Sequence, residues 1–258
     1  MLFRSALLAA ALGVVALACG DVPTLEGGIA FISPVILPSP AVAFGDTLRN
    51  EAGEVAPLRV FAIDNAGDTL QNVEPTFVVT TVPGPSVTIL ANDLVRGDSV
   101  RTASIVGRVG TRLQTPPAQL SVVFQPDSMA AGSPTTASFP ALGVGVITSS
   151  VPLSVNVTSI GGGTRAGVPS IIVRYLITNI YPAGTTVPDT TVVLVDDQSR
   201  FAGNGLAAVD TTDASGNASR QIRAVPFGFD SVAIAVSANN LKGIPLPGGP
   251  IRFVVSTK

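Results

Sequence analysis

The chain has no histidine, no tryptophan and a single cysteine, Cys19, in 258 residues. Without histidine, Ser-His-Asp and Cys-His arrangements are excluded, and so are zinc sites with imidazole ligands. Without a second cysteine no disulfide can form within the chain, so the core must hold by burial alone. A Ser-Lys pair would have to use Lys242, which lies in a loop rich in Gly and Pro without a Ser-x-x-Lys spacing.

Charged side chains are also scarce, at 12% of the residues, and the net charge is only −2. No basic patch is present, so the sequence predicts no nucleic-acid partner. Paired carboxylates remain the main candidates for catalysis, because a glycosidase needs only two acids at a suitable separation. The nearest groupings are Asp196 with Asp197 and Asp210 with Asp213.

These acids are better explained as residues of turns. Adjacent residues of a strand point to opposite faces, so Asp196 and Asp197 cannot both line one cleft if the strand continues through them. A calcium site would draw on Asp64, Asp68, Asp196 and Asp197, but no twelve-residue calcium loop occurs. We therefore expect ordinary turn aspartates, and neither a catalytic residue, a metal nor a cofactor.

Few residues suggest a surface for ligands. The chain has only two tyrosines, and Tyr181 in "NIYPAG" is the aromatic residue that we place on a loop. The predicted loop covers residues 178–190, "TNIYPAGTTVPDT", and Tyr181 and Asp189 are its candidate partner-binding residues. The tripeptide Arg96-Gly97-Asp98 matches the integrin-binding motif, but a polar hairpin turn explains it better.

The N-terminus predicts export. Arg4 precedes an apolar run, Ala6 to Ala18, that is shorter than the roughly 20 residues needed to span a bilayer, as in a signal peptide covering residues 1–18. Ala16-Leu17-Ala18 fits ordinary signal peptidase, and the same bond fits lipoprotein processing, in which Cys19 becomes the lipidated first residue. The lone cysteine at this position favours lipid attachment at Cys19, with residues 19–27 as a lipidated tether.

Helix signals are nearly absent, because Gly and Pro interrupt every apolar period of 3.6 residues. Short β-branched runs recur between turn residues, and residues 153–157 alternate between apolar and polar side chains, as in a half-buried strand. Such runs without intervening helices predict an all-β fold of the sandwich type. The runs are residues 58–63, 77–82, 120–124, 153–157, 171–177, 191–195, 219–225, 231–236 and 251–255.

An internal repeat sets the expected number of domains. Residues 60–73 align without a gap to residues 155–168, and each copy passes from a strand through a Gly-containing turn to a threonine and a valine. The offset corresponds to one sandwich domain. We therefore expect two tandem β-sandwiches, residues 28–128 and 141–258, joined by a Ser/Thr/Ala/Gly/Pro-rich linker over residues 129–140.

The second copy resembles a known family. The segments "SVPLSVNVTSIGGGTRAGVPSIIVRYLI" and "TTDASGNAS", together with the closing "GPIRFVVSTK", are similar to bacterial immunoglobulin-like domains of the invasin and intimin type. The resemblance covers residues 151–258, and the first copy matches less well. It implies an immunoglobulin-like sandwich outside the cytoplasm that serves in adhesion, display or spacing, without catalysis.

Together these patterns predict a non-enzymatic lipoprotein of the cell envelope, held on a membrane by acylated Cys19 at the outer membrane, the cell surface or in the periplasm. In this interpretation the immunoglobulin-like domains form an adhesion, display or structural spacer module. The alternative is a lipoprotein that binds a protein or glycan through the loops at one end of a sandwich.

Overall fold

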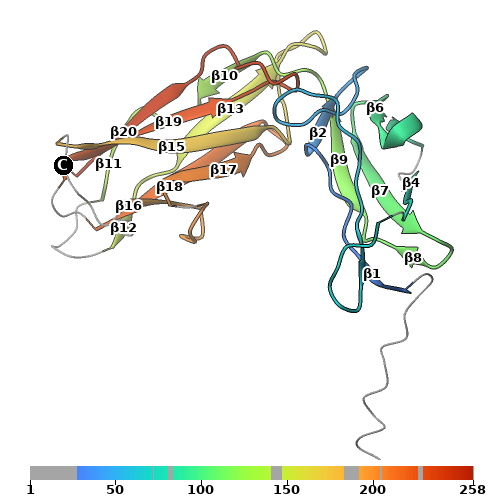
Figure 1. Ribbon diagram of the computed structural model, residues 1–258. Coiled ribbons are helices and arrows are strands. Elements are labelled where there is room, and N and C mark those ends of the chain that lie inside the picture. Colours follow the sequence, from blue (N-terminus) through green and yellow to red (C-terminus); the bar gives the residue numbers. More distant parts are fainter. Residues whose placement is uncertain are drawn as a thin grey trace, which may run out of the picture. The chain divides into compact units, whose positions relative to one another are not determined.

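A computed structural model describes residues 28–71, 73–80, 84–140, 147–182, 192–203, 205–225 and 229–257 (Figure 1). These residues form strands and turns, with short 3-10 segments such as η2 (Ala91–Asp93), so the all-β prediction is confirmed. No helix in the described segments is long and apolar enough to cross a membrane. The chain divides into two compact units, Met1–Ile36, Arg59–Val78 and Val106–Ala118 in the first, and Leu37–Leu58, Val79–Ile105 and Gln119–Lys258 in the second. Both units include residues from 28–128, so the expected domain boundaries stay a prediction.

The first unit contains two antiparallel pairings. Strand β1 (Ile29–Ile32) pairs with β3 (Ala62–Asp64), with a bulge near its start. Strand β8 (Leu113–Gln114) pairs with the end of β7 (Thr102–Val109). A bridge between Ile63 and Thr69 closes a hairpin, as expected for the first copy of the repeat.

The N-terminal part of the second unit carries two further pairings. Strand β2 (Ala41–Ala43) runs parallel to β9 (Ala118–Val123). Strand β4 covers Thr76–Val79. Strand β5 (Val87–Ile89) pairs antiparallel with β6 (Val95–Gly97).

The rest of the second unit, residues 127–257, forms the C-terminal sandwich of two sheets (Figure 1). The six-stranded sheet has the order β10-β13-β18-β12, with β14 paired to β13 and β16 paired to β18. The five-stranded sheet has the order β11-β20-β19-β15-β17, in which β11 runs parallel to β20 and the other pairs are antiparallel. The bounds are β10 (Ser128–Ala131), β11 (Thr136–Ser138), β12 (Thr148–Ser149), β13 (Leu153–Ser159), β14 (Ala166–Gly167), β15 (Ile172–Tyr181), β16 (Val192–Val195), β17 (Ala207–Thr211), β18 (Asn217–Ala224), β19 (Ser231–Ala238) and β20 (Ile251–Ser256).

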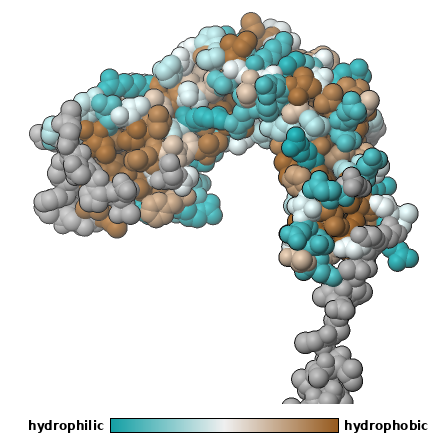
Figure 2. Space-filling model, in the orientation of Figure 1, coloured by the Kyte–Doolittle hydropathy of each residue, from teal (hydrophilic) through white to brown (hydrophobic). Residues whose placement is uncertain are grey.

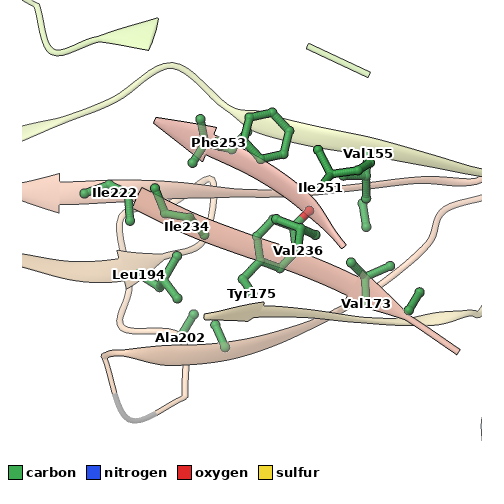
Figure 3. Packing of buried hydrophobic residues seen from close by; sticks show 14 of the residues in the cluster. Val155, Val173, Tyr175, Leu194, Ala202, Ile222, Ile234, Val236, Ile251 and Phe253 are labelled. Atoms are coloured by element: carbon green, nitrogen blue, oxygen red, sulfur yellow. The ribbon is translucent and has the colours of Figure 1, made fainter. Parts of the chain in front are cut away.

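The core of this sandwich follows from the alternation of its strands. Leu153, Val155 and Val157 of β13 are fully buried, and the polar residues between them face outward. Figure 3 shows Val155, Leu194 and Ile222 of one sheet and Val173, Tyr175 and Phe253 of the other within a single hydrophobic cluster. Burial of apolar surface from both sheets therefore stabilises the fold without a disulfide.

Residues 129–140, expected to be a linker, are instead ordered in the sandwich. They contain most of β10 and the whole of β11, and Met129 is 3% exposed in the core. Pro134 lies between the two strands, where the chain passes from one sheet to the other. The Ser, Thr and Ala residues that suggested a linker fit short edge strands, which need little apolar surface of their own.

Several large apolar side chains remain exposed, and brown patches reach the surface between hydrophilic residues in Figure 2. In the C-terminal sandwich these include Leu176, Leu206 and Val209 on or beside β15 and β17, with exposures of 48%, 42% and 51%.

Candidate functional site

All the candidate acids except Asp210 lie in one type of tight turn. In each turn the first residue is Asp or Asn, and its Oδ1 accepts the backbone N–H groups of the third and fifth residues at 2.8–3.1 Å. The fourth residue has a positive φ of 60–90°. The backbone N–H of this fourth residue donates to the carbonyl of the first residue. The backbone N–H of the first residue donates to the carbonyl of the fifth. The turns are Asn50–Glu54, Asp64–Asp68, Asp196–Arg200, Asp213–Asn217 and Asn240–Ile244.

This shared geometry explains why aspartates occur at strand ends. Asn50 and Asn240 make the same two side-chain bonds as Asp196 and Asp213, so the role needs an oxygen acceptor and no negative charge. At Asp196 the N–H of Arg200 is the main cause that holds the pKa of the carboxyl below its usual range. The hydrogen bonds of the turns therefore explain why Asp64, Asp196 and Asp213 lie where they do.

The two segments that carry the family resemblance meet in space. Gly167 of "AGVP" lies against the turn Asp213–Asn217, where a Cβ at Gly167 would overlap the carbonyl oxygen of Ser215. Gly216 accepts a hydrogen bond from the N–H of Val157 at 2.8 Å, and a Cβ at Gly216 would overlap the carbonyl oxygen of Val157. The two glycines are required because backbone approaches backbone at this point.

A buried threonine completes this junction. The hydroxyl of Thr212, a residue only 4% exposed, donates to the carbonyl of Val168 at 2.7 Å and accepts the N–H of Ile171 at 2.9 Å. Its own N–H bonds to the carbonyl of Ile171 at 3.0 Å. The resemblance thus rests on residues that hold the turn and the start of β15 together.

Asp210 and Arg220 form an ion pair between the two sheets, which we call the clasp. Arg220 Nη2 lies 3.0 Å from Asp210 Oδ1, and the two side chains are 15% and 21% exposed. Arg220 also donates to the carbonyls of Val209 at 2.6 Å and Ser219 at 3.0 Å. Asp210 accepts the N–H groups of Ser219 at 2.8 Å and Thr211 at 2.9 Å. One ion pair therefore satisfies four backbone groups on β17 and β18.

The clasp also borders the core. Tyr175 on the neighbouring strand β15 is 1% exposed, and its burial raises the pKa of the phenol, with the charge of Asp210 adding to the effect. Tyr175 therefore remains a neutral phenol in the sandwich interior.

The sandwich brings three of the predicted acids to the rim of one open hollow of about 330 Å³. It is lined by Asp197, Asp210 and Asp213, together with Arg220 and residues of β13 and β18. Asp210 is bound in the clasp and Asp213 in its turn, so their oxygens already accept protein hydrogen bonds. Within the described segments, no three His, Cys, Asp or Glu side chains are grouped to hold a metal ion.

The tripeptide Arg96-Gly97-Asp98 does not form the hairpin turn that we expected. Arg96 and Gly97 belong to β6, and the turn lies earlier in the chain. The Arg96 guanidinium bonds to Asp98 at 2.8 Å, and the hydroxyl of Thr88 donates to the same carboxylate at 2.5 Å. This bond from Thr88 is the main cause that lowers the pKa of Asp98. The two charges neutralise each other within the protein.

The first four residues of the expected partner-binding loop belong to a strand. Residues 178–181 continue strand β15, because β19 extends alongside them and pairs Tyr181 with Ser231. The Tyr181 hydroxyl accepts a hydrogen bond from Arg252 at 2.9 Å, across β19. The loop placement of Tyr181 was therefore wrong. Asp189 and Cys19 lie outside the described residues, so their roles stay predictions.

Turn aspartates were expected from the sequence, but the geometry that the five turns share and the clasp were not. The recurrence of Asp or Asn three residues before Gly or Ser was a readable signal for this shared geometry. The clasp had no local signal, because Asp210 and Arg220 lie on strands of different sheets and meet only when the two sheets pack together.

The chain is similar to solved structures at low identity. The match to the Yersinia pseudotuberculosis adhesin InvE covers 90% of this chain and 61% of that one, at 15% identity and a TM-score of 0.34. The match to domains 4 and 5 of the S-layer protein SbsC covers 88% of this chain and 98% of that one, at 13% identity and a TM-score of 0.31. The match to the D00-D0 domain of intimin covers 86% of this chain and 99% of that one, at 12% identity and a TM-score of 0.23. Likenesses at these TM-scores establish no shared function. No family model and no curated protein matches the chain.

Proposed function

We propose that this protein is a non-enzymatic module of the bacterial cell envelope, anchored through a lipid on Cys19 and used for adhesion, display or spacing. The single observation that carries the non-enzymatic part is the use made of its acids. Asp64, Asp196 and Asp213 hold turns, and Asp210 closes the side of the sandwich. The side chains with the best claim to chemistry thus support the scaffold.

The anchor rests on the sequence. An apolar signal followed by the chain's only cysteine would place a lipid ten residues before Ile29, the first residue of β1. One acyl chain binds a membrane only marginally, whereas two or more hold it stably, as in a lipoprotein. A compact β-sandwich joined to such an anchor by a short tether suits display at a membrane surface.

Metabolic labelling tests this proposal. Bacteria expressing the full chain are fed a fatty acid with an alkyne group, and the protein is examined for label and for its distribution between membrane and soluble fractions. We expect label and membrane association in the unaltered protein and neither in a Cys19→Ser variant. A Ser5→Cys, Cys19→Ser variant is the matched control, because it retains one cysteine inside the signal. Membrane association without label would contradict the lipid anchor.

A second measurement addresses catalysis. Replacing Asp197, Asp210 and Asp213 together with Asn should leave adhesion or display by the cells unchanged, provided that the variant folds. A hydrolytic activity on envelope glycans that disappears in this variant would overturn the non-enzymatic proposal.

A further inference from the structure

The first unit presents one face of a two-stranded ribbon to solvent. The ribbon is formed by β1 and β3, and β1 begins ten residues after Cys19. Along the chain into β3, Val60 and Ala62 are buried, whereas Phe61 between them is 41% exposed. Successive side chains of a strand point to opposite faces. One face of the ribbon is therefore buried, and the other presents Phe61.

A β-bulge turns a second phenylalanine to the open face. Along a regular strand Ile29 and Phe31 would point to the same side, because they are two residues apart. The pairing of β1 with β3 shifts between these two residues. Ile29 is buried, whereas Phe31 is 53% exposed. The bulge therefore re-aims Phe31 outward, as bulges in other sheets re-aim a side chain.

The two phenylalanines lie on the same face of the ribbon. Phe31 is paired with Ile63. Two residues farther along, the N–H of Ser33 donates to the carbonyl of Phe61 at 2.8 Å, so that these two residues lie opposite each other. Opposite residues of an antiparallel pair point to one face, and their diagonal neighbours are close enough for aromatic side chains to adjoin. Phe31 and Phe61 are such diagonal neighbours, and they form one apolar surface.

This surface continues to an isoleucine and an arginine. Ile36 and Arg59 exchange backbone hydrogen bonds at 2.8 and 3.3 Å, and Ile36 is 43% exposed. Arg59 is also exposed and, by alternation from Phe61, lies on the open face. We call Phe31, Ile36 and Phe61, with Arg59 at their border, the ribbon face. Apolar side chains beside a basic one are typical of amphipathic segments that bind at a membrane surface.

We propose that the ribbon face lies on the surface of the membrane to which a lipid at Cys19 attaches the protein. The proposal rests on the lipid anchor proposed above. Ten residues extend over at most about 35 Å, so the anchor would keep the start of β1 within that distance of the lipid headgroups. Contact of the ribbon face with the membrane is then an intramolecular event at high effective concentration, and it requires little affinity of its own.

The chemistry of the ribbon face fits a lipid surface. Burial of the two exposed rings of Phe31 and Phe61 at the boundary of the acyl chains removes apolar surface from water. Arg59 can cover apolar surface with its stem while its guanidinium donates hydrogen bonds to lipid phosphates. A membrane thus satisfies both the rings and the charge at their border.

The absence of tryptophan allows a direct test. A chain that begins at Cys19 retains every residue that the structure describes, and its single thiol is coupled to a maleimide phospholipid in phosphatidylcholine vesicles. Phe31→Trp then supplies the only indole. We expect phosphatidylcholine brominated on its acyl chains to quench about half or more of this fluorescence, because a ring at the acyl boundary contacts the bromine atoms. The matched control is Phe201→Trp, which replaces a ring of the second unit that is 58% exposed, and its fluorescence should not change.

A second measurement gives the contribution of the rings to binding. A protein coupled to a single acyl chain binds vesicles only marginally and reversibly, so an added contact is visible in its partition coefficient. Phe31→Ser, Phe61→Ser should lower this coefficient about tenfold or more, because two apolar rings no longer leave water. Leu176→Ser, Phe201→Ser removes two side chains of similar exposure from the C-terminal sandwich, and it should leave the coefficient unchanged.

The outcomes distinguish this proposal from the anchor itself. Absence of fatty-acid label in cells would contradict the anchor, whereas the chemically coupled protein tests the ribbon face without it. An indole of Phe31→Trp that stays unquenched in coupled protein would overturn the proposal, and so would an unchanged partition coefficient in a folded Phe31→Ser, Phe61→Ser variant. A dimer of the uncoupled protein that this double variant dissociates would assign the ribbon face to a second copy and overturn it as well. If the double variant does not fold, quenching of Phe31→Trp decides.

Discussion

Replacing Gly216 by alanine should destabilise the C-terminal sandwich far more than the same change at Gly163. Both glycines have left-handed backbones, with φ of 80° and 86°, and both occupy turns. A Cβ at Gly163 would meet nothing within 4 Å, whereas a Cβ at Gly216 would overlap the backbone of Val157 and of Gly167. The two variants therefore share a conformational penalty and differ in packing.

The magnitudes follow from this difference. A left-handed conformation costs a residue with a Cβ about 1–2 kcal/mol, which sets the expected loss for Gly163→Ala. At Gly216 the backbone must also shift, which weakens the 2.8 Å bond from the N–H of Val157. An unsatisfied buried group costs a further 1–3 kcal/mol or so. We expect a total loss of roughly 3–4 kcal/mol for Gly216→Ala.

Urea unfolding followed by tyrosine fluorescence measures this difference. The chain has no tryptophan, and both tyrosines, Tyr175 and Tyr181, belong to β15, so the signal reports on the C-terminal sandwich. In each variant the urea concentration at the midpoint of unfolding should fall. The dependence of the unfolding free energy on urea concentration should stay the same, because the surface exposed on unfolding does not change. Equal losses for Gly163→Ala and Gly216→Ala would refute the close approach of Gly216 to Val157.

Four other variants test the turns. Asp213→Ala should cost about 1–2 kcal/mol of stability in urea unfolding, because two backbone N–H groups lose their acceptor. Asp213→Asn keeps an oxygen acceptor and should cost less than about 0.5 kcal/mol. Equal losses for the two variants would contradict the need for an oxygen acceptor. Ser199→Gly should raise the thermal midpoint, with a gain of roughly 0.5–1 kcal/mol, because Ser199 has a φ of 60° that glycine adopts without strain; a lower midpoint would argue against strain there. The pKa of Asp196 is lowered in the folded state, so its stabilisation is complete above the unfolded pKa of about 3.9 and is lost as pH falls through the folded value. Asp196→Asn should keep the turn and reduce the fall in stability below about pH 4, and an unchanged acid profile would remove Asp196 from the explanation.

Much of the C-terminal sandwich could be read from the sequence. The expected strand over residues 153–157 is β13, and the run at 251–255 is β20, because alternating or β-branched apolar residues pack well on a pleated surface. Turn aspartates were also expected, since Asp followed by Gly at the left-handed position satisfies its hydrogen bonds within five residues.

The errors came from segments that depend on distant partners. Residues 178–181 precede the segment "PAGTTVP", which contains Pro and Gly, yet β19 extends β15 through Tyr181. Residues 129–140 have the composition of a linker, but their partners β13 and β20 lie farther along the chain. The composition of a segment indicates only its local conformational preference. The hydrogen bonds to a distant strand that make these segments β-strands cannot be read from it.

Local chemistry and long-range contact thus account for different parts of this protein. The all-β class, the absence of histidine chemistry and the turns follow from residues that act on their near neighbours. Gly167 against Ser215, and Arg220 against Asp210, follow only from the packing of two sheets. An i to i+4 hydrogen bond is set by a few backbone angles, whereas the clasp requires two strands from different sheets to meet at one edge.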